Sequence, residues 1–334
     1  MVLSDLTARR REFHFWVACA PEHLLKDQRD WPVLHLYLNI MLVSVPAAVV
    51  LLEQDSHVVG AVYFLMHFLL FEERFMLCMH YMSHTGLFRW APLDWIVHGA
   101  LSPLFGIPPG LYHLHHVVMH HGGNNRSGRD LSSTERYQRD NVVHFITYWL
   151  RFALFIWFEL PMFAVRRRRY RQAATACAGM ALFWAGSCVL FAWKPAFVVW
   201  ALWVPVLASS VALALGNWAQ HLFIDPANSR SSYGSAYCVV NTPANQRTLN
   251  DGYHIEHHLN PTRHWSELPG AFIDNRRQYE HHDCVAFKSL DFIRVCLLVF
   301  AGDYKKLSRH LVRFRPRGRS EVERFLRARL APVA

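Results

Sequence analysis

The stretch Asn250-Asp251-Gly252-Tyr253-His254-Ile255-Glu256-His257-His258 decides how the rest of the chain is interpreted. As a helix, it carries His254, His257 and His258 at positions i, i+3 and i+4, so three imidazole rings leave one face within a single turn. Imidazole is the commonest metal ligand among protein side chains. The stretch therefore predicts a helix face that binds a metal.

Three earlier stretches extend this pattern at helical spacing. They are 80–84 (HYMSH), with His80 and His84; 116–121 (HVVMHH), with His116, His120 and His121; and 217–221 (NWAQH), with Asn217 and His221. Even a six-coordinate ion cannot use nine imidazoles, and structural zinc takes four ligands, so the count predicts two metal ions side by side. Nitrogen ligands without paired cysteines indicate iron, zinc, copper or nickel, and iron is expected if oxygen is a reactant.

The composition of the 334-residue chain fits either one large soluble domain or a small polytopic membrane protein, because 52% of it is hydrophobic. Its seven cysteines show no paired spacing, which indicates reduced thiols and a reducing compartment. The net charge of +10 comes from basic residues beside hydrophobic stretches, so anionic lipid is a better partner than nucleic acid. Residues 1–21 lack the apolar core and cleavage site of a secretory signal peptide.

The hydrophobic pattern predicts four transmembrane helices. They are 33–52, the first half of 57–79, 174–193 and 196–216. Prolines and glycines interrupt 93–111, so we expect an interfacial or re-entrant segment there. The segment 142–165 is apolar enough to span, but an even number of spans must separate the second and third histidine stretches if both line one site. We therefore expect it at the interface, with the arginine run 166–171 on the cytosolic side.

Three regions follow from this layout: a cytosolic arm (1–32), a membrane domain (33–290) and a basic tail (291–334). Within the membrane domain, 222–290 is too polar to span and is expected to form a cytosolic helical cap. Between Lys305 and Arg329 the tail has ten lysines and arginines against two glutamates. Its interleaved Leu, Val and Phe predict a surface helix on acidic lipid.

The three boxes, the NWAQH segment and the placement of the 174–216 hairpin resemble the membrane fatty acid desaturase superfamily over roughly residues 33–290. The resemblance implies an all-α integral membrane protein with a di-iron centre on the cytosolic face. It also implies a hydrophobic tunnel for a long acyl chain of a lipid. The expected reaction is desaturation, with O2 as co-substrate and two electrons from outside.

The resemblance also implies how the ligands are divided. One iron is expected on His80, His84, His121 and His258, with Asn217 acting through a water, and the other on His116, His120, His221, His254 and His257. Asp225 and Glu256 are candidates to accept imidazole N–H groups behind the ligands, and ordinary solvated acids are the equal alternative.

The source of electrons and the outcome of the reaction stay open. The third box starts with His254 instead of glutamine, and no His-Pro-Gly-Gly haem signature occurs, so a separate donor such as cytochrome b5 or ferredoxin is expected. Leu259, Pro261 and the segment 265–269 are also similar to carotenoid hydroxylases and ketolases, which leaves a hydroxylase or ketolase with the same centre as the alternative.

Two other classes fit the sequence less well. A metal transporter would need ionisable ligands inside the spans, and 174–193 and 196–216 contain neither acidic residues nor histidine. A zinc hydrolase needs far fewer ligands. In a eukaryotic cell, the endoplasmic reticulum is the expected membrane.

Overall fold

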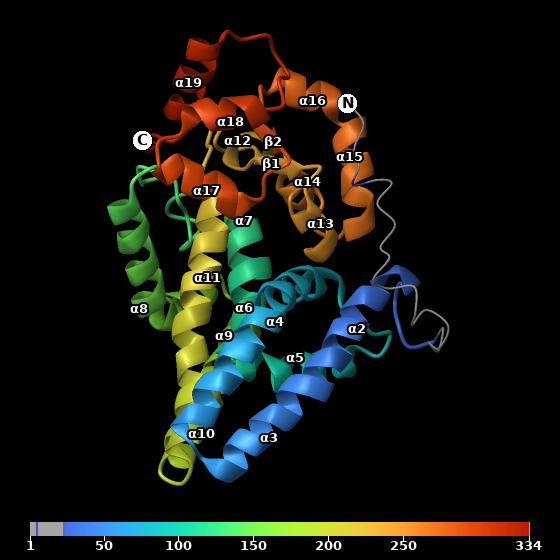
Figure 1. Ribbon diagram of the computed structural model, residues 1–334, viewed down its shortest axis with the longest axis vertical. Coiled ribbons are helices and arrows are strands. Elements are labelled where there is room, and N and C mark those ends of the chain that lie inside the picture. The colour runs from blue at the N-terminus through green and yellow to red at the C-terminus, as the bar shows by residue number, and fades with distance from the viewer. Residues whose placement is uncertain (1–4, 6–22, 334) are drawn as a thin grey trace. The chain divides into compact units, whose positions relative to one another are not determined.

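The computed structural model describes residue 5 and residues 23–333, and it is mostly helical (Figure 1). Most of the expected N-terminal arm therefore lies outside the described residues. Contacts divide the chain into two compact units, each built from separate stretches of sequence. In the described residues, unit 1 consists of residue 5, 119–156 and 213–333, and unit 2 of 23–118 and 157–212.

Unit 2 begins with a helical run, and the next helix returns alongside it. The run comprises the short η3 (Gln28–Asp30), α2 (Trp31–Asn39), the π-helix η4 (Ile40–Ser44) and α3 (Val45–Gln54). Asp55, in the left-handed conformation, ends it, and α4 (His57–Thr85) returns alongside α3 (Figure 1). Ala48, Leu51 and Tyr63 pack together between them. The first histidine box is thus the last turn of a 29-residue helix.

The segment after α4 is broken, as its prolines and glycines predicted. It consists of α5 (Ala91–Leu101), η5 (Ser102–Phe105), an irregular turn and α6 (Leu111–His113). Gly106 has a φ of +68°, and a Cβ there would lie 2.2 Å from the backbone nitrogen of Val206. This close approach explains the glycine and fixes the segment against the backbone of a neighbouring helix.

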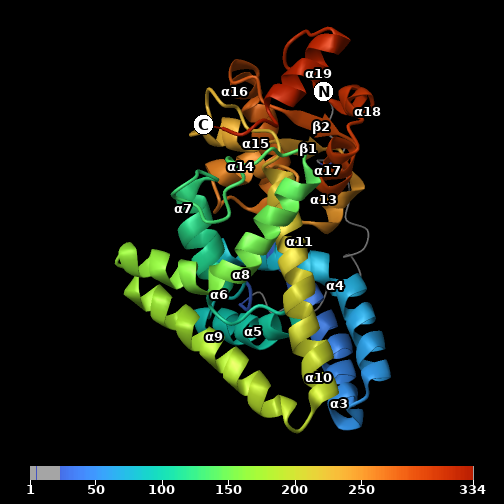
Figure 2. The ribbon, with the colours of Figure 1, turned by 90° about the vertical axis from the view of Figure 1, so that its left-hand side faces the viewer.

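The remaining long helices are α8 (Val142–Arg166), α9 (Tyr170–Phe191), the short pieces α10 (Pro195–Val198) and η7 (Val199–Trp203), and α11 (Val204–Gln220). Figure 2 shows α9 leading through a tight turn into α10 and α11. This is the hairpin expected from the two apolar stretches and the Lys194-Pro195 turn.

Four helices of the described residues are long and apolar enough to cross a membrane: Gln28–Gln54, Val142–Arg166, Tyr170–Phe191 and Pro195–Gln220. Three of them match predicted spans. The difference concerns α4, which carries Glu72, Glu73 and Arg74, and α8, which was expected at the interface. The protein is an integral membrane protein, and leucines and valines of these helices are exposed as lipid contact requires.

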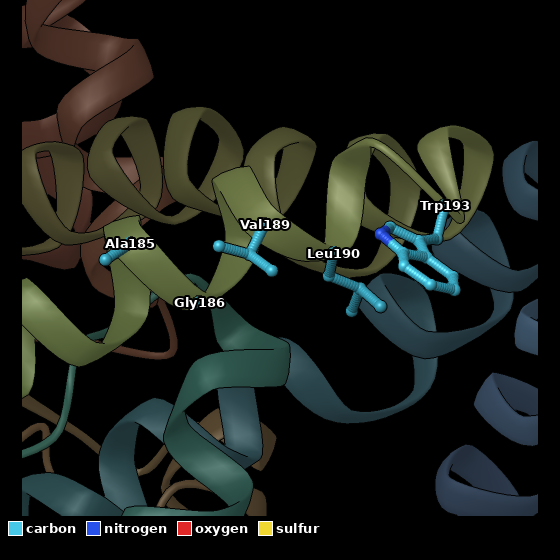
Figure 3. A pocket seen from close by; sticks show the side chains of 5 residues that line it. All are labelled: Ala185, Gly186, Val189, Leu190 and Trp193. Carbon is cyan, nitrogen blue, oxygen red and sulfur yellow. The ribbon is translucent and has the colours of Figure 1, made fainter.

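A shallow apolar hollow lies on the second half of α9 and the turn after it (Figure 3). Its lining consists of Ala185, Gly186, Val189, Leu190 and Trp193. All five residues come from one candidate span and its end, so the hollow is part of the surface that faces lipid.

Unit 1 surrounds a short parallel pair of strands, β1 (Cys238–Val240) and β2 (Ala286–Lys288). Between them in sequence lie α13 (Pro243–Arg247), α14 (His254–Leu259), η8 (Trp265–Glu267), α15 (Leu268–Asp274) and α16 (Arg276–His281), with α12 (Ser232–Ser235) before β1. The third histidine box is α14. The six described cysteines are free, as expected.

The C-terminal tail is part of the core of unit 1, and this corrects the prediction of a lipid-bound surface helix. It forms α17 (Phe292–Phe300), α18 (Tyr304–His310) and α19 (Arg319–Ala328). Its interleaved apolar residues, among them Val295, Leu307, Val322 and Leu326, are buried together with Trp218. The amphipathic pattern was recognised correctly, but its apolar side packs on protein.

Candidate metal centre

The second histidine box is wound differently from the α-helix that its spacing predicted. Leu114–His120 is a π-helix (η6), and a short α7 (His121–Gly123) follows. The wider winding of a π-helix, common at functional sites, redistributes the side chains around the axis. The boundary between the units also falls inside this box, after Val118. His116 belongs to unit 2, whereas His120 and His121 belong to unit 1.

Four histidines gather in unit 1: His120, His221, His254 and His258. One nitrogen of each lies within 4.8 Å of those of the others. The Nε2 atoms of His221 and His254 are 3.3 Å apart, and those of His254 and His258 are 3.1 Å apart. Two nitrogens that share one ion at about 2.0 to 2.1 Å lie about 2.8 to 3.4 Å from each other. The spacing therefore fits ligands of a common metal.

Contacts behind two of these rings determine which nitrogen faces the group. The Nδ1–H of His120 donates to Oδ2 of Asp130 at 2.7 Å, and the Nδ1–H of His221 donates to the carbonyl of Ser235 at 2.7 Å. Neither acceptor can donate a proton in return, so Nδ1 carries the hydrogen and Nε2 keeps its lone pair. These two imidazoles are held in the tautomer that binds a metal through Nε2.

Burial also keeps the rings neutral. It lowers the pKa of His221 to about 3, and the neighbouring His120 adds to the effect. Burial, followed by the charges of His254 and His121, lowers the pKa of His258 well below its usual value. Neutral imidazole is the form that coordinates metal, so the environment favours binding without protons having to leave first.

Two further histidines of unit 1 form a pair beside this group. The Nε2 atoms of His121 and His257 are 3.0 Å apart, and the ring of His121 also stacks on His258 at 4.6 Å. On α14, the ring of His254 lies 4.6 Å from that of His258 and 6.0 Å from that of His257. This grouping differs from the predicted division of ligands, which placed His258 with His121 and His257 with His254.

Unit 2 contains a three-histidine group made of His80, His84 and His116. Their ring centroids are 4.2 Å apart for His80 and His116, and 4.9 Å for His84 and His116. Tyr112 stacks on His116 at 5.4 Å. The two histidines of the first box thus contact the first histidine of the second box within one unit. This is possible because His80 and His84 share one face of α4.

The four-histidine group also tests the membrane topology. His120 precedes α8, α9 and α11 in the chain, and His258 follows them, yet their rings are 5.1 Å apart. An even number of complete crossings must therefore separate them. Since α9 and α11 form a hairpin, a complete crossing by α8 would place the two boxes on opposite faces. The interfacial position of α8 stays a prediction from this count of crossings, since its length and composition would allow it to span.

A family model described as "Fatty acid desaturase" matches residues 56–289, more than half of the chain. The chain belongs to the fatty acid desaturase family. Comparison with curated proteins found no match, and comparison with solved structures found none either. The matched range contains all nine histidines and Asn217, so the desaturase assignment covers the whole candidate centre. As a member of this family, the protein is a membrane oxidoreductase with a histidine-rich metal site.

Asp130 is a residue of the candidate centre that sequence reasoning missed, and it accepts a hydrogen bond from His120. It lies in the polar segment 122–140, which looked like an ordinary loop, but it is buried and Oδ1 accepts hydrogen bonds from the backbone N–H and the hydroxyl of Ser132. The only signal for it was a carboxylate shortly after the second box.

The other polar candidates have partners of their own. Asn217 donates through Nδ2 to the carbonyl of Ser132 and the hydroxyl of Tyr148, which connects it to Asp130. Asp225 forms an ion pair with Arg329 at 3.2 Å. Glu256 accepts hydrogen bonds from Tyr279 and Asn275, and burial raises its pKa. In these contacts, Asp225 and Glu256 anchor neighbouring elements of unit 1.

Proposed function

We propose that this protein is an O2-dependent desaturase that introduces a double bond into a long-chain acyl group of a lipid. The observation that carries the proposal is the four-histidine group, with its converging Nε2 atoms, in a chain of the fatty acid desaturase family. Iron is the proposed metal because oxygen chemistry on an unactivated carbon chain requires a redox-active ion, which zinc is not.

The first iron is assigned to His120, His221, His254 and His258. Unit 1 also contains His121 and His257, which are proposed as ligands of a second ion. His80, His84 and His116, the group in unit 2, are the remaining proposed iron ligands. Asn217, whose amide nitrogen is hydrogen-bonded at Ser132, is the tenth candidate ligand, through a water.

The residues of the chain have three tasks in this reaction. Asp130 and the carbonyl of Ser235 hold imidazole rings so that Nε2 faces the metal. Burial excludes water, which would otherwise consume a reactive oxidant. The exposed apolar helices anchor the protein in a membrane, where long acyl chains are found. Iron bound there would supply O2 activation and removal of hydrogen from two neighbouring carbons.

Two electrons must come from a separate donor such as cytochrome b5 or ferredoxin. The proposed location of the active site is the cytosolic face, and in a eukaryote the membrane would be that of the endoplasmic reticulum.

Elemental analysis of detergent-purified protein, followed by product analysis with lipid extracts, tests the proposal. We expect about two irons per chain in the wild type, fewer in a His254→Ala, His258→Ala double variant, and an unchanged content in His281→Ala, which changes an exposed histidine of the same unit. A product that has lost two hydrogen atoms identifies a desaturase. A product that has gained oxygen identifies the hydroxylase or ketolase instead, and iron-free wild-type protein after expression with ample iron would overturn both.

A further inference from the structure

The turn between α8 and α9 is the most strongly charged stretch of the described chain. Residues 166–171 read Arg-Arg-Arg-Arg-Tyr-Arg, and every one of them is exposed. Among the described residues, no carboxylate forms an ion pair with these arginines. One side-chain contact of the turn is a cation–π interaction of Arg167 with Phe163 at 5.4 Å. Five guanidinium groups are therefore available within six residues.

The backbone conformation at Arg168 would favour glycine over arginine. Arg168 has a φ of +58°, in the left-handed region that favours glycine. The amide of Arg169 donates to the carbonyl of Ala164 at 2.8 Å, which closes the end of α8 in the manner usual for a helix with glycine at this position. An arginine at such a position is conformationally unfavourable, and this points to a use for its side chain.

The surroundings place the turn at a membrane surface. It joins the ends of two helices that are long and apolar enough to span. Met162 and Val165 on one side are exposed, and so is Tyr170, an aromatic residue of the kind found at headgroup level. Charged groups between apolar helix ends meet lipid headgroups before they meet soluble molecules.

We propose that residues 166–171 form a binding site for the headgroup of an anionic phospholipid. Guanidinium groups bind phosphate oxygens through paired N–H donors, which a lysine cannot do. The composition agrees, because the turn contains five arginines and no lysine. A general preference for positive charge on one side of the membrane would be satisfied by either residue and would not favour arginine in the left-handed position.

Native mass spectrometry of the full-length protein in detergent tests this site. Short-chain phosphatidylglycerol is titrated against phosphatidylcholine of the same chain length, and the apparent affinities are compared. Wild type is expected to prefer phosphatidylglycerol. Each arginine removed should cost about fivefold in that preference, so Arg167→Gln with Arg169→Gln should cost about 25-fold. The preference should also weaken as salt is added.

Two further variants separate the site from folding and from overall charge. Arg168→Gly relieves the left-handed backbone, so it should be at least as thermally stable as wild type while losing about fivefold in preference. Lys305→Gln with Lys306→Gln removes two exposed charges from α18 and should keep the wild-type preference. Equal losses in the turn and α18 variants would overturn the proposal, as would unchanged binding in the turn variants. Complete displacement of the lipid by an equal concentration of inorganic phosphate would overturn it too, because the ligand would then be free phosphate.

Discussion

The two histidine groups of this desaturase-family protein have different neighbours in their described contacts. In unit 1, the rings of His120 and His221 are hydrogen-bonded through Nδ1 to Asp130 and to a backbone carbonyl. In unit 2, aromatic rings pack on the group, with Tyr112 stacked on His116 and Tyr81 tilted against His80. A hydrogen bond determines both the tautomer and the direction of a ring, whereas stacking determines only its plane. The orientation of His120 and His221 should therefore depend strongly on Asp130 and Ser235.

The largest expected effect comes from Arg139, the buried centre of the unit 1 scaffold. Its guanidinium donates to the carbonyls of Leu222, Thr134, Glu135, Tyr137, Arg329 and Ala331. It thereby joins the residue after His221, the segment that carries Asp130 and the C-terminal end. Arg139→Ala removes these bonds and leaves buried carbonyls without donors, so we expect destabilisation by at least about 3 kcal/mol, measured by thermal unfolding in detergent.

The control for this change is Arg136→Ala, three residues earlier and exposed, which should stay within about 0.5 kcal/mol of wild type. If Arg139→Ala proved as stable as this control, the C-terminal helices would not depend on the buried guanidinium.

The next effect is expected at the hydrogen bond behind a ligand. Asp130→Asn keeps the size of the side chain but removes its charge and lets an N–H compete for His120. Loss of such a partner typically lowers metal affinity about 10- to 100-fold, and we expect this range in competition with a chelator. Asp225→Asn changes a carboxylate that pairs with Arg329, and metal retention should remain as in wild type.

A smaller effect is expected in unit 2. Tyr112→Leu removes the stacked ring from His116, and such aromatic contacts contribute about 0.5 to 1.5 kcal/mol. Metal retention should fall by about tenfold at most, and Tyr112→Phe, which keeps the ring, should match wild type. A loss for Tyr112→Leu larger than that for Asp130→Asn would reverse the proposed order of the two groups.

The smallest effect is expected at Glu256, which lies inside the third box but binds Asn275 and Tyr279. Glu256→Gln retains an acceptor for the Tyr279 hydroxyl, so thermal stability should change by no more than about 1.5 kcal/mol and metal content should not change. A clear loss of metal in this variant would show that the carboxylate supports a ligand, as the sequence had suggested as one possibility.

Much of this protein follows from local sequence patterns. Histidines three to five residues apart predicted the metal-binding elements because neighbours on a helix are set by its period alone. Long apolar stretches predicted the α9–α11 hairpin and the first span because crossing a bilayer requires a minimum length. The glycines and prolines in 93–111, among them Gly106 and Pro108, predicted that this segment would not be one helix. Both residue types disturb a helix through their own backbone, whatever packs around them.

Contacts between distant parts of the chain were decided only by the tertiary structure. The second box contains a π-helix instead of an α-helix, and His116 and His120 belong to different units, which the spacing alone does not reveal. The hydrogen bonds of Asp130 and Arg139 and the burial of the C-terminal helices bring together residues far apart in sequence. The sequence shows which groups are available for such contacts, and the tertiary structure determines their partners. The reason is that burial and hydrogen bonding depend on what surrounds a side chain in space.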